Sequence, residues 1–181
     1  MALRRGFKTE ANWYARSFRQ DLGLSSHDPL CPRKLAHHLE IPLVSLVDFV
    51  TDIPDVVSYL HGPGQNEFSA VTICNGMEKV ILFNDAHSPK RQAADISHEL
   101  SHIILQHPPK PPIGPDGSRH YDLEIEEEAN WLGPALLVSD EAAVWIARNR
   151  MSIAAASDFF GVSEDLVRMR VNVCGAYRRA A

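Results

Sequence analysis

The chain has 181 residues, of which 45% are hydrophobic and 23% charged, and its net charge is −5. This composition is typical of a globular protein with a buried core, and it excludes a disordered or fibrous protein. The negative charge excludes a general electrostatic attraction to nucleic acid. No apolar stretch reaches the roughly 20 residues that a membrane span needs, and no secretory signal follows the N-terminus. We therefore expect a cytoplasmic protein without a membrane anchor, and its three scattered cysteines favour reduced thiols.

The N-terminal part of the chain is predicted to be helical. Apolar residues recur at helical spacing over residues 7–22, and Gly23 follows as a C-cap. A second, short helix is expected around residues 34–39. Its neighbouring His37 and His38 point about 100° apart on a helix, so we interpret them as solvent-facing rather than as metal ligands.

Two apolar segments rich in β-branched residues follow, Phe68–Cys74 and Met77–Asn84. They are joined by Asn75-Gly76, which is the strongest short-range signal for a two-residue hairpin turn. The sequence therefore predicts a small antiparallel sheet that precedes the next helix.

That helix is predicted over residues 89–106, because Ser88 supplies an N-cap and proline occupies the first helical position. It carries the HExxH pattern, with His98 and His102 one turn apart, so that both imidazoles can reach a zinc ion at about 2.0–2.1 Å. Glu99 is placed to take a proton from water at the metal but is angled away from the metal itself. Composition alone predicts about 0.03 occurrences of this pattern, so two solvent-facing histidines on an amphipathic helix are the weaker alternative.

A hydrolytic zinc site needs a third protein ligand and an open fourth position. The acidic segment that opens the following helix is a source of carboxylates, although the helix macrodipole favours acids there whatever their function. Glu126 shares its helical face with the small residues Ala129 and Gly133, which would let the two helices approach closely. Glu126 is therefore the preferred third ligand, and Glu128 and Glu124 are the alternatives.

The order of hairpin, HExxH helix, loop and Glu-x-x-Ala-Asn helix leading into a Leu-Leu pair resembles the ImmA/IrrE family of zinc metallo-endopeptidases. The resemblance is strongest over residues 68–138. It implies zinc held by His98, His102 and Glu126, with Glu99 as the catalytic glutamate. It also implies a protein substrate, often a helix-turn-helix repressor. The expected fold class is α+β, a helical zincin-like metallopeptidase domain with a small antiparallel sheet and a C-terminal helix-turn-helix-like segment.

The chain departs from the family pattern in two places. Gly133-Pro134 is expected to interrupt the helix, and Val138-Ser139 replaces a common Met-Pro. We expect a single metallopeptidase domain over 1–181, with three parts. These are an N-terminal helical part (1–50), a catalytic core (51–139) and a helical segment (140–181).

The expected reaction is hydrolysis of a peptide bond. Glu99 would accept a proton from water and later deliver it to the leaving amine. The developing oxyanion needs a further donor, for which His120, Tyr121 and His107 are candidates. An edge of the hairpin could align an extended substrate by strand addition.

A rival interpretation comes from the C-terminal segment. Helices expected at residues 152–160 and 163–172, separated by a turn at Gly161, have the layout of a helix-turn-helix, and the second ends in arginines. A DNA-binding transcriptional regulator is therefore an alternative function. Glu164 and Asp165 would repel phosphate at the turn that meets DNA, so a packing or protein-recognition unit is favoured. A third alternative is a zinc-binding sensor without proteolysis.

Overall fold

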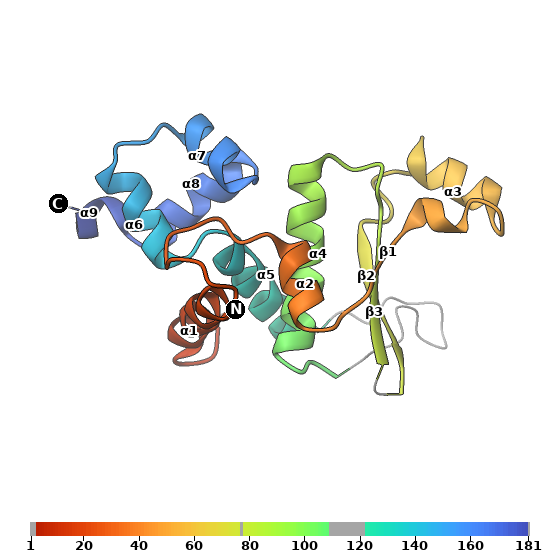
Figure 1. Cartoon of the computed structure of the whole chain (residues 1–181), viewed down its shortest axis with the longest axis horizontal. Coiled ribbons are helices and arrows are strands. Elements are labelled where there is room, and N and C mark those ends of the chain that lie inside the picture. The colour runs from red at the N-terminus through yellow and green to blue at the C-terminus, as the bar shows by residue number, and fades with distance from the viewer. Residues whose placement is uncertain (1–2, 77, 109–121, 181) are drawn as a thin grey trace.

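The computed structural model describes residues 3–76, 78–108 and 122–180 and combines helices with one small sheet, as the α+β class requires (Figure 1). The helices are α1 (Phe7–Asp21), α2 (Pro32–His38), α3 (Pro54–His61), α4 (Pro89–Ile104), α5 (Leu123–Leu137), α6 (Asp140–Arg148), α7 (Ile153–Phe160), α8 (Glu164–Val173) and α9 (Ala176–Ala180). The strands are β1 (Leu43–Ser45), β2 (Ala70–Asn75) and β3 (Glu78–Phe83), and a short 3-10 helix, η1 (Leu46–Phe49), follows β1.

The sheet is mixed rather than antiparallel throughout. Its strand order is β1-β3-β2, with β3 in the centre. The β2–β3 hairpin is antiparallel as predicted, and Thr72 lies opposite Ile81. The prediction of a purely antiparallel sheet is wrong because β1 pairs with β3 in parallel, with Leu43 opposite Ile81. A three-residue strand has too short a pattern to be recognised in a sequence, and its direction is set by long-range pairing.

The hairpin turn lies one residue later than predicted. Asn75 pairs with Glu78 and therefore ends β2 instead of forming the first turn position. Gly76 is the first residue of the connection and has φ +63°, in the left-handed region that glycine adopts without steric cost.

Helix α4 begins as the sequence predicts and ends in a Schellman motif. The Ser88 side chain accepts a hydrogen bond from the backbone of the first turn, and Pro89 opens the helix. At the other end Gln106 has φ +54°, and the His107 N–H donates back to the His102 carbonyl at 3.0 Å. This 6→1 bond satisfies a carbonyl that the helix leaves free, and it folds the chain back over the last turn.

Helix α5 runs without interruption through Gly133 and Pro134, so the predicted break at this pair is wrong. Packing against α4 supplies the reason. The Ser97 hydroxyl donates to the Gly133 carbonyl at 3.0 Å, and a Cβ at position 133 would lie only 3.3 Å from the backbone nitrogen of His98. Contacts with α4 thus hold the helix together where proline removes one hydrogen bond.

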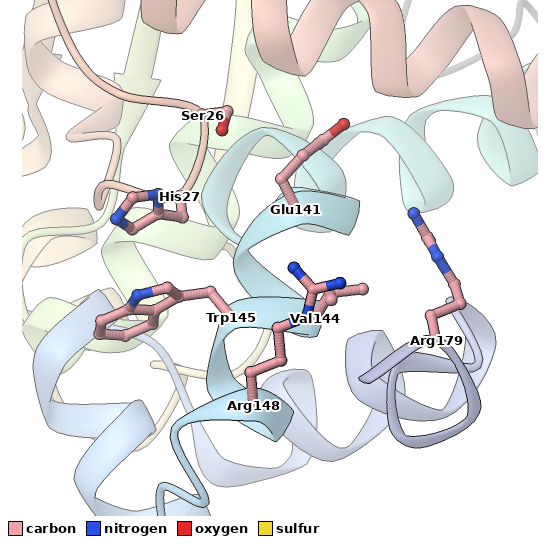
Figure 2. Close-up of a pocket in the computed structure, with 7 residues that line it drawn as sticks. All are labelled: Ser26, His27, Glu141, Val144, Trp145, Arg148 and Arg179. Atoms are coloured by element: carbon pink, nitrogen blue, oxygen red, sulfur yellow. The ribbon is translucent and has the colours of Figure 1, made fainter. Parts of the chain in front are cut away.

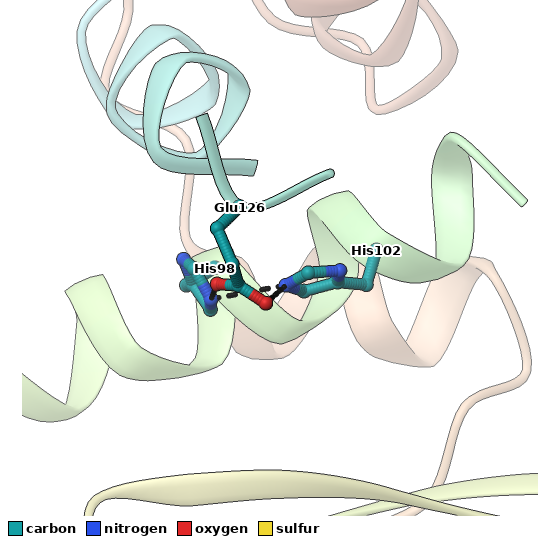
Figure 3. Close-up of side chains that lie close together, drawn as sticks. All are labelled: His98, His102 and Glu126. Carbon is teal, nitrogen blue, oxygen red and sulfur yellow. Dashed lines mark hydrogen bonds and ion pairs between the residues drawn. The ribbon is translucent and has the colours of Figure 1, made fainter. Parts of the chain in front are cut away.

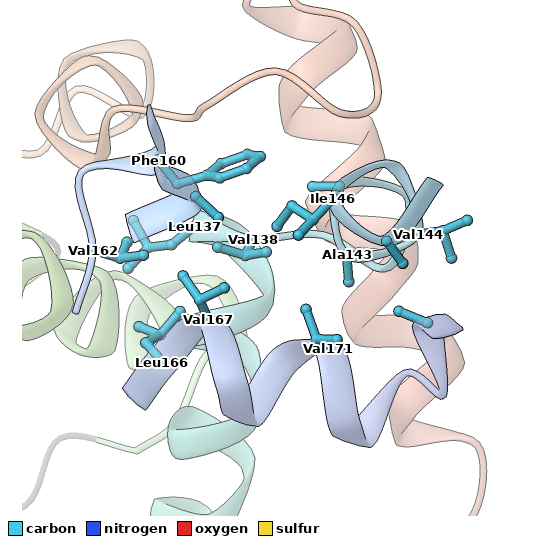
Figure 4. Close-up of a cluster of buried hydrophobic side chains, with 14 residues drawn as sticks. Leu137, Val138, Ala143, Val144, Ile146, Phe160, Val162, Leu166, Val167 and Val171 are labelled. Carbon is cyan, nitrogen blue, oxygen red and sulfur yellow. The ribbon is translucent and has the colours of Figure 1, made fainter. Parts of the chain in front are cut away.

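Two clusters of buried apolar side chains meet on α5. The first joins α1, α2, the sheet, α4 and α5, and it includes Leu136. The second joins the end of α5 to α6–α9 and includes Leu137 (Figure 4). Each large apolar side chain fully buried in these clusters contributes about 1.5–3 kcal/mol. Helix α5 therefore belongs to both parts of the core.

Two buried arginines hold the C-terminal end of α5. The Nη2 atom of Arg19, from α1, donates to the Leu137 carbonyl at 3.1 Å. The Nε atom of Arg170, from α8, donates to the Val138 carbonyl at 2.8 Å, and its Nη2 atom contacts Asp140. Burial lowers the pKa of Arg19 to about 10. Carbonyl groups at a helix end need such partners, so both arginines act as side-chain caps.

The remaining predictions divide into those that the structure bears out and those outside its range. Helices α7 and α8 form at the predicted places, with Gly161 in a left-handed conformation between them. His37 and His38 are exposed. The loop expected after the HExxH helix lies, beyond residue 108, outside the described residues. Over the described part of the chain, no helix combines the length and the apolar character needed to cross a bilayer.

Candidate metal centre

Three side chains from two helices converge on one point (Figure 3). His98 and His102 lie one turn apart on α4, and Glu126 lies in the first turns of α5. The two Nε2 atoms are 3.0 Å apart. The Glu126 carboxylate is 3.3 Å from His98 Nε2 and 3.6 Å from His102 Nε2. Within the described residues, this is the group of histidine, cysteine and acidic side chains whose geometry could hold a metal ion.

These distances fit a tetrahedral metal ion. Zinc bonds of about 2.0–2.1 Å at tetrahedral angles place neighbouring ligand atoms about 3.3 Å apart. The measured separations of 3.0, 3.3 and 3.6 Å bracket this value. Two imidazoles and one carboxylate are also the ligand types of hydrolytic sites with three protein ligands and one open position. The three residues therefore fit a resident metal ion.

The charges in this cluster influence one another strongly. Burial alone would lower the pKa of His98, but the hydrogen bond to Glu126 and the negative charges of Glu99, Glu126 and Asp95 raise it above its ordinary value. Hydrogen bonds from His102 and His98 hold the pKa of Glu126 far below its usual range. Glu126 is therefore a carboxylate at any pH at which the protein would work.

Glu99 is held by the edge strand of the sheet. The Thr72 hydroxyl, on β2, donates to Glu99 Oε2 at 2.6 Å. Helical geometry turns Glu99 about 100° from its neighbour His98, so the carboxylate lies between α4 and β2 rather than on the metal ligands' face. The sequence offered no signal for Thr72, because a threonine in a strand is common and its partner lies 27 residues away.

A third histidine, His107, contacts the cluster through His102. His107 Nδ1 lies 2.9 Å from His102 Nδ1, on the side of that ring remote from Glu126. His107 Nε2 lies 3.3 Å from Glu128 Oε2, and Glu128 Oε1 accepts from Arg4 Nε at 2.6 Å. Burial lowers the pKa of His107, an effect that Glu128 opposes.

The structure separates the glutamates that the sequence left as alternatives. Glu126 faces the two histidines, whereas Glu128 contacts His107 and Arg4, and Glu124 is exposed. Of the candidate oxyanion donors, His120 and Tyr121 lie outside the described residues. His107 contacts His102, a predicted ligand, through Nδ1 and Glu128 through Nε2, so both of its ring nitrogens are engaged.

A recess of about 310 Å³ lies elsewhere, among α6, α9 and the segment that follows α1 (Figure 2). His27 and Trp145 stack on one another at its rim with ring centroids 5.2 Å apart. Its lining includes Arg148 but none of the residues of the converging cluster. It is therefore a separate surface feature.

The comparison with protein families agrees with the geometry. The sequence pattern of the IrrE N-terminal-like domain, a peptidase family, matches residues 57–172. The chain therefore belongs to the ImmA/IrrE family of metallopeptidases. Membership implies a metal cofactor and a protein substrate. No curated protein and no solved structure matches the chain significantly.

Proposed function

We propose that this protein is a zinc-dependent endopeptidase in which His98, His102 and Glu126 hold the metal and Glu99 is the general base. The observation that carries the proposal is the convergence of the three ligand atoms within 4.8 Å of one another. In the HExxH pattern Glu99 follows His98 directly in the sequence, and its negative charge acts on His98. We take the whole chain as one metallopeptidase domain with a zincin-like core.

The mechanism assigns each side chain a distinct task. When bound, zinc supplies Lewis-acid chemistry, which makes water a nucleophile near neutral pH and polarises a carbonyl group. Glu99 accepts the proton of the attacking water and later gives it to the leaving amine. The hydrogen bond from Thr72 fixes one carboxylate oxygen of Glu99 and leaves the other for proton transfer.

Strand β2 offers a place for an extended substrate. It lies at the edge of the sheet, and among the described residues its outer edge has no strand partner. A peptide that paired with this edge would lie alongside Thr72, and therefore next to Glu99. Main-chain pairing of this kind would hold the scissile bond in place with little demand on its side chains.

We propose that the substrate is a partner protein in the cytoplasm, such as a helix-turn-helix repressor whose cleavage would release gene expression. This rests on the family resemblance. The residues of the site support only the wider class of peptide substrates.

The charges of α8 weigh against DNA as the ligand. Arg168 pairs with Glu164 and Asp165 on its own helix. Arg170 is only 1% exposed and is bound to the end of α5. Burial keeps Arg170 from phosphate, and two acidic neighbours offset the charge of Arg168, so we propose that the C-terminal helices serve packing or protein recognition.

The decisive experiment measures metal content and cleavage in the same samples. We expect the wild-type chain to bind one zinc ion and His98→Ala and Glu126→Ala to lose it. Glu99→Gln should keep zinc but lose cleavage of a repressor encoded beside the protein's own gene. His38→Ala, which removes an exposed histidine from α2, is the matched control and should retain both properties.

Full cleavage by Glu99→Gln would refute the role of Glu99 as general base. Zinc binding together with no cleavage of any tested protein by the wild type would favour the sensor without proteolysis. Salt-sensitive binding of the purified chain to a specific duplex would favour the DNA-binding regulator.

A further inference from the structure

His107 contacts a predicted zinc ligand although it is not part of the HExxH pattern. Its side chain is 9% exposed and lies between His102 and Glu128. The rings of His102 and His107 meet nearly edge to face, with centroids 5.0 Å apart and an interplanar angle of 69°. Both contacts of His107 use ring nitrogens, so the positions of its protons matter.

One requirement fixes the position of each proton in the series of contacts His102–His107–Glu128. His102 faces Glu126 and His98 with Nε2, so metal binding requires a lone pair on that atom. Neutral His102 then carries its proton on Nδ1 and donates it to His107 Nδ1 across 2.9 Å. His107 must therefore carry its own proton on Nε2, and this N–H points at Glu128 Oε2, 3.3 Å away. Each hydrogen bond is therefore donated in one direction, from His102 to His107 and from His107 to Glu128.

We propose that His107 is a positioning residue, which accepts the Nδ1–H of His102 and so fixes the orientation and the tautomer in which His102 binds the metal. This inference rests on the proposed zinc site. A ligating histidine commonly donates its second ring N–H to a carboxylate or carbonyl group. Here a second imidazole takes that place and passes the contact on to Glu128.

The backbone places His107 for this role. Gln106 adopts φ +54°, and the His107 N–H donates to the carbonyl of His102 itself. The Schellman motif usually brings an apolar side chain of this position onto the last helical turn. In this protein the motif brings the His107 imidazole onto the His102 imidazole. The turn that ends α4 therefore also creates the contact between the two rings.

The chain of contacts extends to the N-terminal segment. Glu128 accepts from Arg4, which also pairs with Glu10 of α1 at 2.7 Å. Glu128 therefore has a fixed carboxylate with one oxygen for Arg4 and the other for His107. Arg4 is 51% exposed, so its own contribution to the metal site is expected to be small.

Three substitutions at position 107 separate positioning from packing. The amide oxygen of asparagine can replace Nδ1 as the acceptor for His102, whereas the amide of glutamine reaches the place of Nε2 and contacts Glu128 instead. We expect zinc affinity, measured by competition with a chromophoric chelator, to fall about 10–100-fold in H107A and H107Q. In H107N it should stay within about tenfold of the wild type. His38→Ala is the control and should not change affinity.

A packing role predicts the opposite order, because glutamine fills the volume of histidine better than asparagine does. Affinity in H107Q equal to or above that in H107N would therefore overturn the proposal. If H107A fails to fold, as judged by circular dichroism, the comparison of the asparagine and glutamine variants still decides. Wild-type protein that binds no zinc would overturn the proposed function and this inference together, whereas normal zinc affinity in all three variants would overturn only the inference.

The tautomers provide a second readout that does not depend on activity. In the zinc-loaded wild type, imidazole nitrogen resonances should show protons on His102 Nδ1 and His107 Nε2. A proton on His107 Nδ1 would mean that His107 donates to His102, and it would overturn the proposal.

Discussion

Replacement of Gly133 by alanine should destabilise the protein, although alanine is the better helix former. A Cβ at this position would lie 3.3 Å from the His98 nitrogen and 3.4 Å from both the His98 Cα and the Ser97 carbonyl carbon. All three are backbone atoms of α4, which cannot rotate away as a side chain can. Pro134 adds to the cost, because a residue with a Cβ is disfavoured in helical conformation before proline.

The magnitude follows from two opposing effects. Alanine in place of glycine stabilises a helix by about 0.5–1 kcal/mol. Overpacking against fixed neighbours costs about 1–3 kcal/mol. We therefore expect Gly133→Ala to lower the free energy of unfolding by about 1–2 kcal/mol. A helix that moves outward by a few tenths of an ångström also carries Glu126, two turns earlier on the same face, away from His98 and His102, so zinc affinity should fall as well.

Urea unfolding of the metal-free protein measures the first effect, and chelator competition measures the second. Asn130→Ala is the matched control, because residue 130 lies on the same helix but is exposed. Its helix propensity should leave stability unchanged or slightly higher. A Gly133→Ala protein as stable as this control, with unchanged zinc affinity, would show that the α4–α5 contact accommodates a methyl group without cost. That result would refute the reasoning.

Three further predictions concern single side chains. Thr72→Val should slow cleavage about tenfold or more at unchanged zinc content, because a hydrogen bond to the Glu99 carboxylate contributes about 1.5–3 kcal/mol; Thr72→Ser should restore the rate. Arg170→Met should lower the free energy of unfolding by about 1–3 kcal/mol in urea titrations, because the Val138 carbonyl loses its donor; an unchanged midpoint would contradict this. Burial and a hydrogen bond to a carboxylate raise the pKa of the Cys174 thiol to about 12. Iodoacetamide at about pH 8 should therefore label Cys174 far more slowly than an exposed thiol. Equal labelling rates, measured by peptide mapping, would contradict this prediction.

The parts of the site that the sequence predicted are those determined by local spacing. The i, i+4 relation of His98 and His102 fixes their common face on any helix, and Ser88 fixes where that helix begins. The preference for Glu126 rested on helical periodicity and on the small residue Gly133, and α5 does approach α4 closely there.

The parts that could not be predicted depend on contacts between distant segments. Thr72 reaches Glu99 only because β2 packs beside α4. Pro134 was expected to break a helix that the contact with α4 preserves. Helix α3 was not predicted because its apolar side chains do not share one buried face: Val57 is buried, whereas Val56 and Tyr59 are exposed.

The contacts of α5 bear on the role of the C-terminal helices. This helix presents Glu126 near its beginning, packs against α4 at Gly133, and ends at carbonyls held by Arg19 and Arg170. Because Arg170 comes from α8, the C-terminal segment fixes one end of the helix whose other end carries the third predicted ligand. The family match also continues to residue 172, almost to the end of α8. We therefore infer that the C-terminal helices are part of the peptidase itself, and that their arginine stabilises α5 rather than contacting nucleic acid.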